Sequence, residues 1–471
     1  MSQSQELKKL KGYRHLMINT IRIITGTIVI LAFAGISGCA ETSLAEATGK
    51  GHIRGINSIV TAPELVFLIE ERAIGTADYK GAAGFAEYDD LTYNFNFDVF
   101  LPGATTASRL ATQTIDVVAD TDYTVVIAGT VANPTIISWE AAERVFEATE
   151  TVFEADFTHL SPALGEVDIY FAAAGTLPVA GNATTSLNYG ERVPHLEFST
   201  GNFELIITPK DDDNPANYIF QSRTISSTPA TRVTFAIFDA DPSITADVSV
   251  NLINAAGGSA SLPDATKPAQ FRLFHAAFGT GSVDAFLDSD FGNVVFSNTP
   301  YGEVSSYSDI ESVSKVFTLT DAGNSGATVH EANISIGANS RRTIIFGGEP
   351  GALAYRELTS DGRSLETHPI VRITNMATNA ALVNAYMLPP GTVITEETLP
   401  QIAGFPTFAD TDFFGLNAGM YEVTITPFGE ITPISTPVTI DIANGDVVDI
   451  AVLDTVDPAL VDLEIFDSTL P

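Results

Sequence analysis

The chain has 471 residues, a formal net charge of −35 at pH 7, 45% hydrophobic residues and one cysteine. This length exceeds what one hydrophobic core needs and predicts roughly three to four domains. The negative charge disfavours nucleic acid and anionic lipid as partners, and a single cysteine excludes a disulfide framework. Because Thr, Val, Ile, Phe and Tyr are abundant and are interrupted by 36 Gly and 24 Pro, the composition predicts an all-β protein.

The first 38 residues have the pattern of a bacterial lipoprotein signal peptide. Basic residues up to Arg22 precede an apolar run from Ile23 to Gly35, which has the length of a secretory signal. The Ile-Ser-Gly-Cys run that follows matches a lipobox, so Cys39 is the predicted lipidated first residue of the mature protein. An uncleaved anchor helix is the alternative, but Arg22 disfavours a membrane span. Ala40, next to the cleavage site, favours the outer membrane of a diderm bacterium, with the protein facing the periplasm or the cell surface.

Four copies of one unit follow the leader. Their opening strands start at Ile53, Ala155, Phe271 and Val371. A polar residue ends this strand in every copy: Asn57, His159, His275 and Asn375. Nine residues later a fixed slot holds Val66, Asp168, Asp284 and Asn384. The regular order of these landmarks indicates an internal repeat.

Each unit has the pattern of a β-sandwich. Phe203, Leu205 and Ile207 alternate with other residues, which predicts a strand with one face on a core. About seven short strands per ~100 residues is typical of an immunoglobulin-like sandwich, whereas solenoid repeats are shorter, at roughly 20 to 50 residues. We therefore expect four tandem immunoglobulin-like β-sandwich domains, arranged like beads on a string to form a stalk. The predicted segments are a signal peptide 1–38, a linker 39–50, a divergent first sandwich 51–150, and sandwiches 151–262, 263–366 and 367–471.

One segment is ambiguous between helix and strand. Apolar residues among glutamates between Trp139 and Glu150 would suit a helix. Because the other three copies have a strand at this place, we predict a strand followed by a linker.

At these landmarks the chain resembles the domain-of-unknown-function 4397 family, which occurs as tandem β-sandwich modules in secreted and surface bacterial proteins. The pattern is a strand ending in His or Asn, then Val-Asp-Ile-Tyr, then Tyr-Gly, then a Gly-x-Tyr-x-Val strand. Unit two matches with His159, 167–170, 189–190 and 201–207. Units three and four keep most of the pattern, and unit one has Val66 instead of the aspartate. The resemblance implies a fold and a surface location but no chemistry.

Catalytic motifs are sparse. Since Cys39 is the only cysteine, thiol nucleophiles and cysteine metal sites are excluded. His330-Glu331 lacks the second histidine of a zinc-protease helix, and neither a nucleophile elbow nor a phosphate-binding loop is present. His159 and His275 would form acid–base pairs with Asp168 and Asp284 across a turn. The alternative is that the imidazoles satisfy loop backbone groups, which asparagine does equally well in the other copies.

Two acidic loops offer calcium ligands. One contains Asp211, Asp212 and Asp213, and the other contains Asp288 and Asp290. Carboxylate oxygens are ligands that calcium takes, but the bidentate glutamate of an EF-hand is missing, and solvated loops are the alternative.

These patterns predict a non-enzymatic, lipid-anchored cell-envelope protein that binds or adheres to a glycan, a polymer or an envelope partner. A ligand-free structural spacer and an accessory subunit of a secreted hydrolase are the alternatives. A spacer predicts no clustered aromatic or acidic face. Two carboxylates in a cleft, roughly 5–10 Å apart, would favour a glycosidase.

Overall fold

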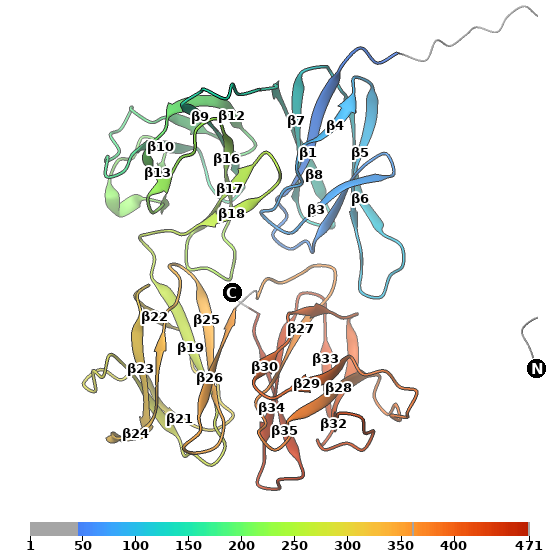
Figure 1. The fold of residues 1–471 in the computed structure, drawn as a ribbon, viewed down its shortest axis with the longest axis vertical. Coiled ribbons are helices and arrows are strands. Elements are labelled where there is room, and N and C mark those ends of the chain that lie inside the picture. Colours follow the sequence, from blue (N-terminus) through green and yellow to red (C-terminus); the bar gives the residue numbers. More distant parts are fainter. Residues whose placement is uncertain (1–45, 360–361, 470–471) are drawn as a thin grey trace, which may run out of the picture. The chain divides into compact units, whose positions relative to one another are not determined.

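The apolar, alternating segments form β-strands in the computed structural model of the protein, which describes residues 46–359 and 362–469 (Figure 1). Eight sheets are present, two in each of four sandwiches. Within the described residues the one helix is a short 3-10 turn, η1 (Pro215–Asn217). The prediction of an all-β chain of tandem sandwiches is confirmed.

The first two sandwiches each combine a mixed sheet with an antiparallel sheet. In the first, the mixed sheet has the order β4 (Ala86–Asp89), β1 (Lys50–Asn57), β7 (Thr121–Gly129), β8 (Pro134–Ala142), and the antiparallel sheet β3 (Arg72–Ala77), β2 (Leu65–Ile69), β5 (Thr92–Val99), β6 (Ser108–Asp116). In the second, the mixed sheet has the order β12 (Arg192–Ser199), β9 (Val152–Leu160), β16 (Arg232–Asp239), β17 (Val248–Asn254), β18 (Ser259–Leu262), and the antiparallel sheet β11 (Thr185–Leu187), β10 (Val167–Ala173), β13 (Asn202–Pro209), β14 (Phe220–Gln221), with β15 (Ile225–Ser226) also on β13.

The third and fourth sandwiches repeat this plan. In the third, the mixed sheet has the order β22 (Ser308–Ile310), β19 (Ala269–Ala276), β25 (Arg341–Gly347), β26 (Ala354–Thr359), and the antiparallel sheet β21 (Phe296–Thr299), β20 (Val283–Leu287), β23 (Lys315–Asp321), β24 (Asn324–Ile334). In the fourth, the mixed sheet has the order β30 (Ala409–Asp410), β27 (Ile370–Asn375), β34 (Val447–Asp454), β35 (Val461–Asp467), with β31 (Phe414–Gly415) also on β27, and the antiparallel sheet is β29 (Ile402–Pro406), β28 (Leu382–Leu388), β32 (Gly419–Pro427), β33 (Val438–Ile442).

The segment that could have been a helix begins as a strand. Residues 139–142 are the last part of β8, and a linker follows them up to β9. The prediction of a strand followed by a linker is therefore confirmed.

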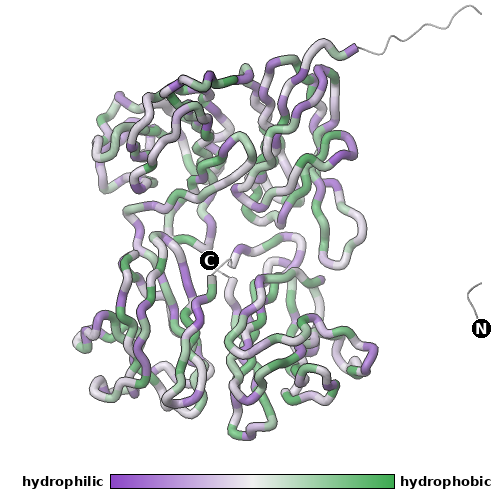
Figure 2. Tube along the Cα trace, viewed as in Figure 1, coloured by the Kyte–Doolittle hydropathy of each residue, from purple (hydrophilic) through white to green (hydrophobic). Residues whose placement is uncertain are grey.

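Each sandwich has its own hydrophobic core between its two sheets. In every sandwich the opening strand pairs in parallel with a later strand: β1 with β7, β9 with β16, β19 with β25, and β27 with β34. Because side chains alternate across a strand, Ile53 and Val125 point into the first core while Ile56 and Val126 belong to a different cluster. The alternation of hydrophobic and hydrophilic residues along the chain can be followed in Figure 2.

The second cluster joins the first sandwich to the second. Ile56 and Val126 of the first mixed sheet pack with Ala236 and Phe238 of the second, and all four are at most 1% exposed. Tyr79 places its ring 5.8 Å from the ring of Phe238, in an edge-on arrangement. Full burial of one such phenylalanine stabilises the folded chain by about 1.5–3 kcal/mol. The outer faces of the two mixed sheets thus form one interface.

An equivalent cluster joins the third sandwich to the fourth. Phe274 and Ile345 of the third pack with Ala451 and Leu453 of the fourth, and all four are buried. The prediction of independent beads in a stalk is therefore wrong for both pairs, since each sandwich shares a buried apolar face with its partner.

The segment before the fourth sandwich also contacts the first one. Arg363 donates to the carbonyl of Val60 at 2.9 Å and also to that of Ala62. The Glu366 carboxylate accepts a 2.6 Å hydrogen bond from the Thr61 hydroxyl. All four sandwiches belong to one structural unit, 47–471.

Candidate ligand cavity between the first two sandwiches

A cavity of about 680 Å³ lies where the first sandwich, the linker after β8 and the second sandwich meet. Small-ligand sites are usually clefts of ~300–1,000 Å³. The side chains that line it are His52, Phe85 and Asp122 of the first sandwich, Glu143, Arg144 and Phe146 of the linker, and, from the second sandwich, Phe153, Phe171, the 225–235 region, Leu252 and 254–256. The cavity therefore joins charged, hydroxyl-bearing and aromatic groups.

The aromatic part of the lining belongs to the second core. Phe153, Phe171 and Phe235 line the cavity and are members of the core cluster of the second sandwich. The Phe171 ring lies 5.0 Å from that of Phe235 and 6.1 Å from that of Phe153. Such tilted and edge-on contacts are the favoured geometries of phenyl rings. The cavity thus opens onto one end of a packed aromatic core.

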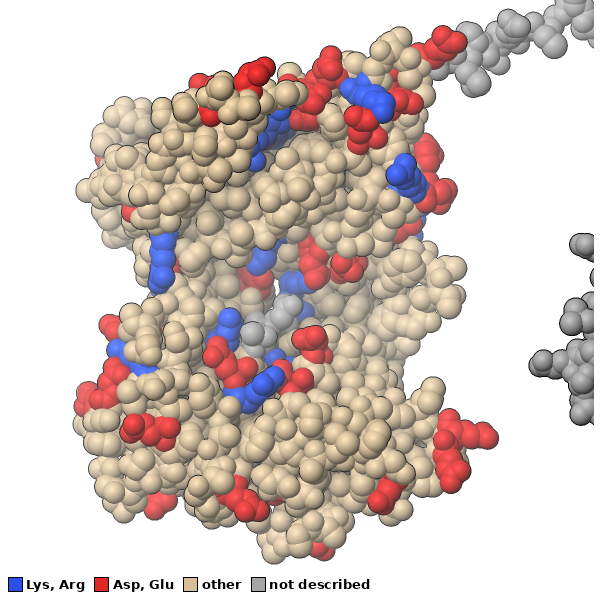
Figure 3. All heavy atoms as spheres, in the orientation of Figure 1, with Lys and Arg blue, Asp and Glu red and all other residues tan. Residues whose placement is uncertain are grey.

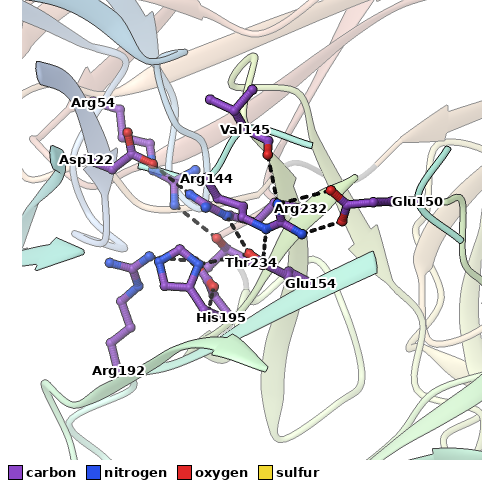
Figure 4. A network of polar contacts seen from close by, with 11 residues as sticks. Arg54, Asp122, Arg144, Val145, Glu150, Glu154, Arg192, His195, Arg232 and Thr234 are labelled. Atoms are coloured by element: carbon purple, nitrogen blue, oxygen red, sulfur yellow. Dashed lines mark hydrogen bonds and ion pairs between the residues drawn. The ribbon is translucent and has the colours of Figure 1, made fainter. Parts of the chain in front are cut away.

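A run of ion pairs forms one wall of the cavity (Figure 4). His52 Nδ1 lies 3.3 Å from Asp122 Oδ1, and the other oxygen of Asp122 accepts a 2.6 Å hydrogen bond from Arg232 Nη1. Arg232 Nε is 3.3 Å from Glu154 Oε2, whose partner oxygen accepts from Arg144 Nε at 2.7 Å. Both oxygens of Asp122 are therefore occupied by basic groups.

The wall ends differently at its two sides. Arg144 is bound by the Glu150 carboxylate through two guanidinium nitrogens. At the other end, Glu143 Oε2 lies 3.9 Å from His52 Nδ1, which is an ion-pair distance but too long for a hydrogen bond. The Glu143 side chain is 28% exposed, so this carboxylate is the accessible acceptor of the wall.

Arg54 lies behind this wall, with both sandwiches around it. It donates to the hydroxyl of Thr124 at 3.0 Å within the first sandwich and to that of Thr234 at 2.9 Å in the second. Its guanidinium also stacks on the ring of Phe85, with the central carbon 4.5 Å from the ring centroid. Burial, together with the nearby positive charge of Arg192, lowers the pKa of Arg54 to about 10. The side chain is 2% exposed and remains charged at neutral pH.

Further acidic groups of β9 complete the network. Glu154 and Asp156 point from β9 toward Arg192 and His195 of β12, where a β-bulge and a φ of +58° turn the backbone N–H of His195 onto Asp156. Burial opposes ionisation of Glu154, but hydrogen bonds from His195 and Arg144 outweigh it and hold the pKa of this carboxyl below its usual value. Three arginines of the network, Arg144, Arg192 and Arg232, pair with four carboxylates: Asp122, Glu150, Glu154 and Asp156. With Arg54 and the Glu143 carboxylate included, the network has one more carboxylate than arginine.

One buried donor in the wall stays without a partner. Arg232 has a side-chain exposure of 9%, and among the described residues nothing accepts a hydrogen bond from its Nη2. A buried unpaired donor costs about 1–3 kcal/mol, and more when it is charged. Arg232 therefore keeps one unused donor inside the wall, at a nitrogen that has almost no accessible surface.

A close backbone contact positions Phe85 at the cavity. Its N–H donates to the carbonyl of Ala255 at 3.1 Å. Two residues on, Gly257 has a φ of +86°, and a Cβ there would lie 2.4 Å from the nitrogen of Gly84. Only glycine allows this approach, so the turn after β17 fixes one side of the site.

The histidines that end the opening strands have a structural role. His159 Nδ1 accepts from the N–H of Ser161 at 3.3 Å, and its Nε2 donates to the carbonyl of Gly165 at 3.0 Å. Burial lowers the pKa of His159, so the ring is neutral at pH 7. Asn57 makes the same kind of pair, accepting from the N–H of Ile59 at 3.1 Å and donating to the carbonyls of Ala77, at the end of β3, and of Pro63 in the loop after β1. His275 and Asn375 repeat it with Ala277 N and Gly281 O, and with Ala377 N and Phe405 O.

The second fixed slot ties neighbouring strands together. Asp168 accepts from the Ser186 hydroxyl at 2.5 Å, from Lys210 at 3.1 Å and from the N–H of Asp211 at 2.9 Å. In the third sandwich, the Asp284 carboxylate accepts hydrogen bonds from the N–H groups of Asn298 and Gly323. In the fourth, the Asn384 side chain accepts from the N–H of Gly404. In the first, Val66 has no polar side chain and lies opposite Thr76 in the pairing of β2 with β3. The histidines and aspartates thus have separate partners, and the geometry gives the acid–base interpretation no support.

The acidic loops do not gather a ligand set. Asp212 and Asp213 accept from groups of their own loop and from the N–H of Ala180, respectively. Asp288 faces Lys315 at 3.0 Å, and Asp290 accepts from Asn293 at 2.7 Å. Across residues 46–359 and 362–469, no three His, Cys, Asp or Glu side chains are grouped so that they could hold a metal ion.

The predicted lipidation site, Cys39, lies outside the described residues. In the part of the chain that is described, no helix has the length and apolar character needed to cross a membrane.

Sequence reasoning missed the cavity and its charged wall. The signal was present as charged residues within otherwise apolar opening strands: Arg54 in β1, Asp122 in β7, and Glu154 and Asp156 in β9. A charged residue inside an apolar strand is expected to be buried and to need a partner, so these positions could have indicated a shared interface.

The same arrangement recurs in the second pair of sandwiches. Arg272 of β19 donates to the Thr343 hydroxyl at 2.9 Å and to that of Ser468 at 2.8 Å. This matches Arg54 in the first pair, and both residues lie three positions before the polar end of their strand. The repeating structural unit is therefore a pair of sandwiches.

Comparison with known proteins agrees with this organisation. The family model described as "Domain of unknown function (DUF4397)" matches residues 51–170 and 269–386, which together are just over half of the chain. The chain belongs to this family, and the resemblance inferred from its motifs is confirmed. Each match spans one complete sandwich and the first two strands of the next.

Other comparisons add little. No curated protein matches the chain. Among solved structures, the Bacillus anthracis TIE protein is similar at 9% identity over 83% of this chain and 68% of that chain, and its TM-score of 0.14 is too low to carry an argument.

Proposed function

We propose that this chain is a non-enzymatic, lipid-anchored protein of the bacterial outer membrane that binds a glycan, a polymer or an envelope partner. The observation that carries the proposal is the cavity at the junction of the first two sandwiches, in which two modules and a linker together present aromatic, hydroxyl and charged groups. The lipobox at Cys39 supports the anchor. The net charge of −35 leaves nucleic acid outside the expected partners.

A ligand-free spacer fits this arrangement less well. Such a protein needs no clustered aromatic or charged surface. Here Phe85 and Phe146 are partly exposed beside Glu143 and Arg144. The shared interfaces of the sandwich pairs fit a binding protein and a spacer equally.

One observation favours a hydrolytic role as the second candidate. Asp122 and Glu143 both line the cavity, and both face His52 Nδ1, at 3.3 and 3.9 Å. Paired carboxylates in a cleft are the machinery of glycosidases. However, the Asp122 side chain is only 7% exposed and accepts a hydrogen bond from Arg232, so Glu143 is the more accessible carboxylate of the two. Binding without hydrolysis therefore fits the geometry better.

Two experiments test the proposal. Mass spectrometry of the protein from cells should find diacylglycerol on Cys39, and Cys39→Ala should release the protein from the membrane fraction. The chain from Ala40 retains every described core, so immobilised protein can be offered glycans and envelope fractions, with and without calcium. Retention of a component that Glu143→Ala loses supports the proposal. Retention of nothing, or hydrolysis of a glycan that is lost in Glu143→Ala, contradicts it.

A further inference from the structure

If the cavity has the proposed binding function, the residues that line it indicate the class of its ligand. Its wall offers both donors and acceptors. The Arg144 side chain is 27% exposed and carries donors, and the Glu143 side chain is 28% exposed and is an acceptor. A ligand group that both donates and accepts, such as a hydroxyl, satisfies the two together.

The charge of the cavity disfavours an ionic ligand. Among the residues that line the cavity, the charges of Arg144 and Arg232 are matched by those of Asp122 and Glu143, and the wider network has one more carboxylate than arginine. An anion would also approach against the net charge of −35, and acidic groups outnumber basic ones on the face shown in Figure 3. A cation would have to lie beside the two guanidinium groups. A neutral ligand avoids both penalties.

The rest of the lining suits a ligand with apolar and hydroxyl surfaces. Phe85 and Phe146 are partly exposed aromatic side chains at the cavity, while Phe153, Phe171 and Phe235 form its deeper side. The end of β15 and the turn before β16 contribute hydroxyl-bearing residues to the lining: Ser226, Ser227, Thr228 and Thr231. The lining therefore offers both aromatic rings and hydrogen-bonding groups to a bound molecule.

We propose that the cavity binds a neutral saccharide. The C–H face of a sugar ring packs against the phenyl side chains, and ring hydroxyls exchange hydrogen bonds with Glu143 and Arg144. The volume of about 680 Å³ holds more than one sugar ring, so a short oligosaccharide or a segment of a polymer is the expected occupant.

The test is calorimetric titration of the chain from Ala40 with neutral oligosaccharides of glucose, mannose and N-acetylglucosamine. Glu143→Ala and Phe146→Ala should each weaken binding about tenfold or more, because each removes a hydrogen bond to a charged group or an aromatic contact. Glu140→Ala is the matched control, since Glu140 is exposed on β8 only three residues away and does not line the cavity. Phe428→Ala, in the fourth sandwich, controls for loss of an exposed phenyl group. Both controls should bind like wild type.

Three results would overturn the inference. The first is that no neutral saccharide binds at concentrations up to about 10 mM. The second is equal binding by wild type and Glu143→Ala, which places any saccharide elsewhere. The third is a preference for acidic saccharides or for alkyl detergents. If an envelope fraction is still retained in a Glu143-dependent manner while neutral saccharides fail to compete, the binding function stands and the saccharide assignment fails. If nothing is retained, both fail.

Discussion

Exchange of a strand-end histidine for asparagine tests whether this position is structural. His159→Asn should fold as stably as wild type at pH 8, because Asn57 shows that an amide can accept from the N–H two residues on and donate to backbone carbonyls. His159→Ala removes both hydrogen bonds and leaves the Ser161 N–H and the Gly165 carbonyl without this partner. The two variants therefore separate hydrogen bonding from any chemistry of the ring.

The magnitudes follow from the two contacts and from burial. Each buried group left unpaired costs about 1–3 kcal/mol, so His159→Ala should lose about 2–5 kcal/mol, and His159→Asn should stay within about 1 kcal/mol of wild type. Burial lowers the pKa of His159, so the unfolded chain takes up a proton before the folded chain does. The stability due to the neutral ring is complete above the unfolded pKa of about 6.5 and declines as pH falls toward the folded value, by up to about 1.4 kcal/mol per pH unit. His159→Asn should lack this decline.

The assay is denaturant unfolding at pH 8 and pH 5.5, followed by fluorescence of Trp139, the one tryptophan of the chain. Its indole N–H donates to the Gly190 carbonyl at 3.0 Å, and the N–H of Gly190 donates to the His159 carbonyl at 2.8 Å, so the reporter is close to the change. Equal destabilisation by His159→Asn and His159→Ala at pH 8, or an unaltered acid response in His159→Asn, would refute the reasoning.

Three further outcomes are expected. Phe238→Ala should cost about 3–5 kcal/mol and red-shift Trp139 emission, since Phe238 is fully buried between the first two sandwiches; an unchanged unfolding midpoint would argue against the interface. Burial opposes ionisation of Asp168, but hydrogen bonds from Ser186 and the Asp211 N–H hold the pKa of this carboxyl below its usual value. The stability that the ionised carboxylate contributes is therefore present above about pH 4 and is lost as pH falls through the folded pKa. Asp168→Asn should be less stable than wild type at pH 7, by about 1–3 kcal/mol, and its stability should respond less to acid, which denaturation at pH 7 and pH 3 measures. Addition of EDTA should leave the unfolding midpoint unchanged, because the acidic loops already use their carboxylates internally, whereas a lower midpoint would indicate a calcium site.

Much of the fold could be predicted because its signals are local. Alternation at Phe203, Leu205 and Ile207 correctly placed one face of β13 on a core. The exchange of Asn57 for His159 between copies predicted a backbone partner, and both side chains form hydrogen bonds with backbone groups. Unit one was harder, because β5 begins with Thr92 and lacks the glycine that marks the equivalent strand in unit four.

The pairing of the sandwiches could not be predicted in this way. Ile56 and Phe238 are ordinary strand residues in the sequence, and nothing local shows that they face another domain instead of their own core. The contact between Arg54 and Thr234 spans 180 residues, so it exists only once both mixed sheets have formed. Buried charges inside apolar strands were the available clue.

Hydrogen exchange of the chain from Ala40, with and without the envelope component it retains, tests the binding cavity most directly. We predict that bound material slows exchange of backbone amides in 143–146 and 225–235, which line the cavity. Protection confined to the third and fourth sandwiches, or no change in these two segments, would contradict the account.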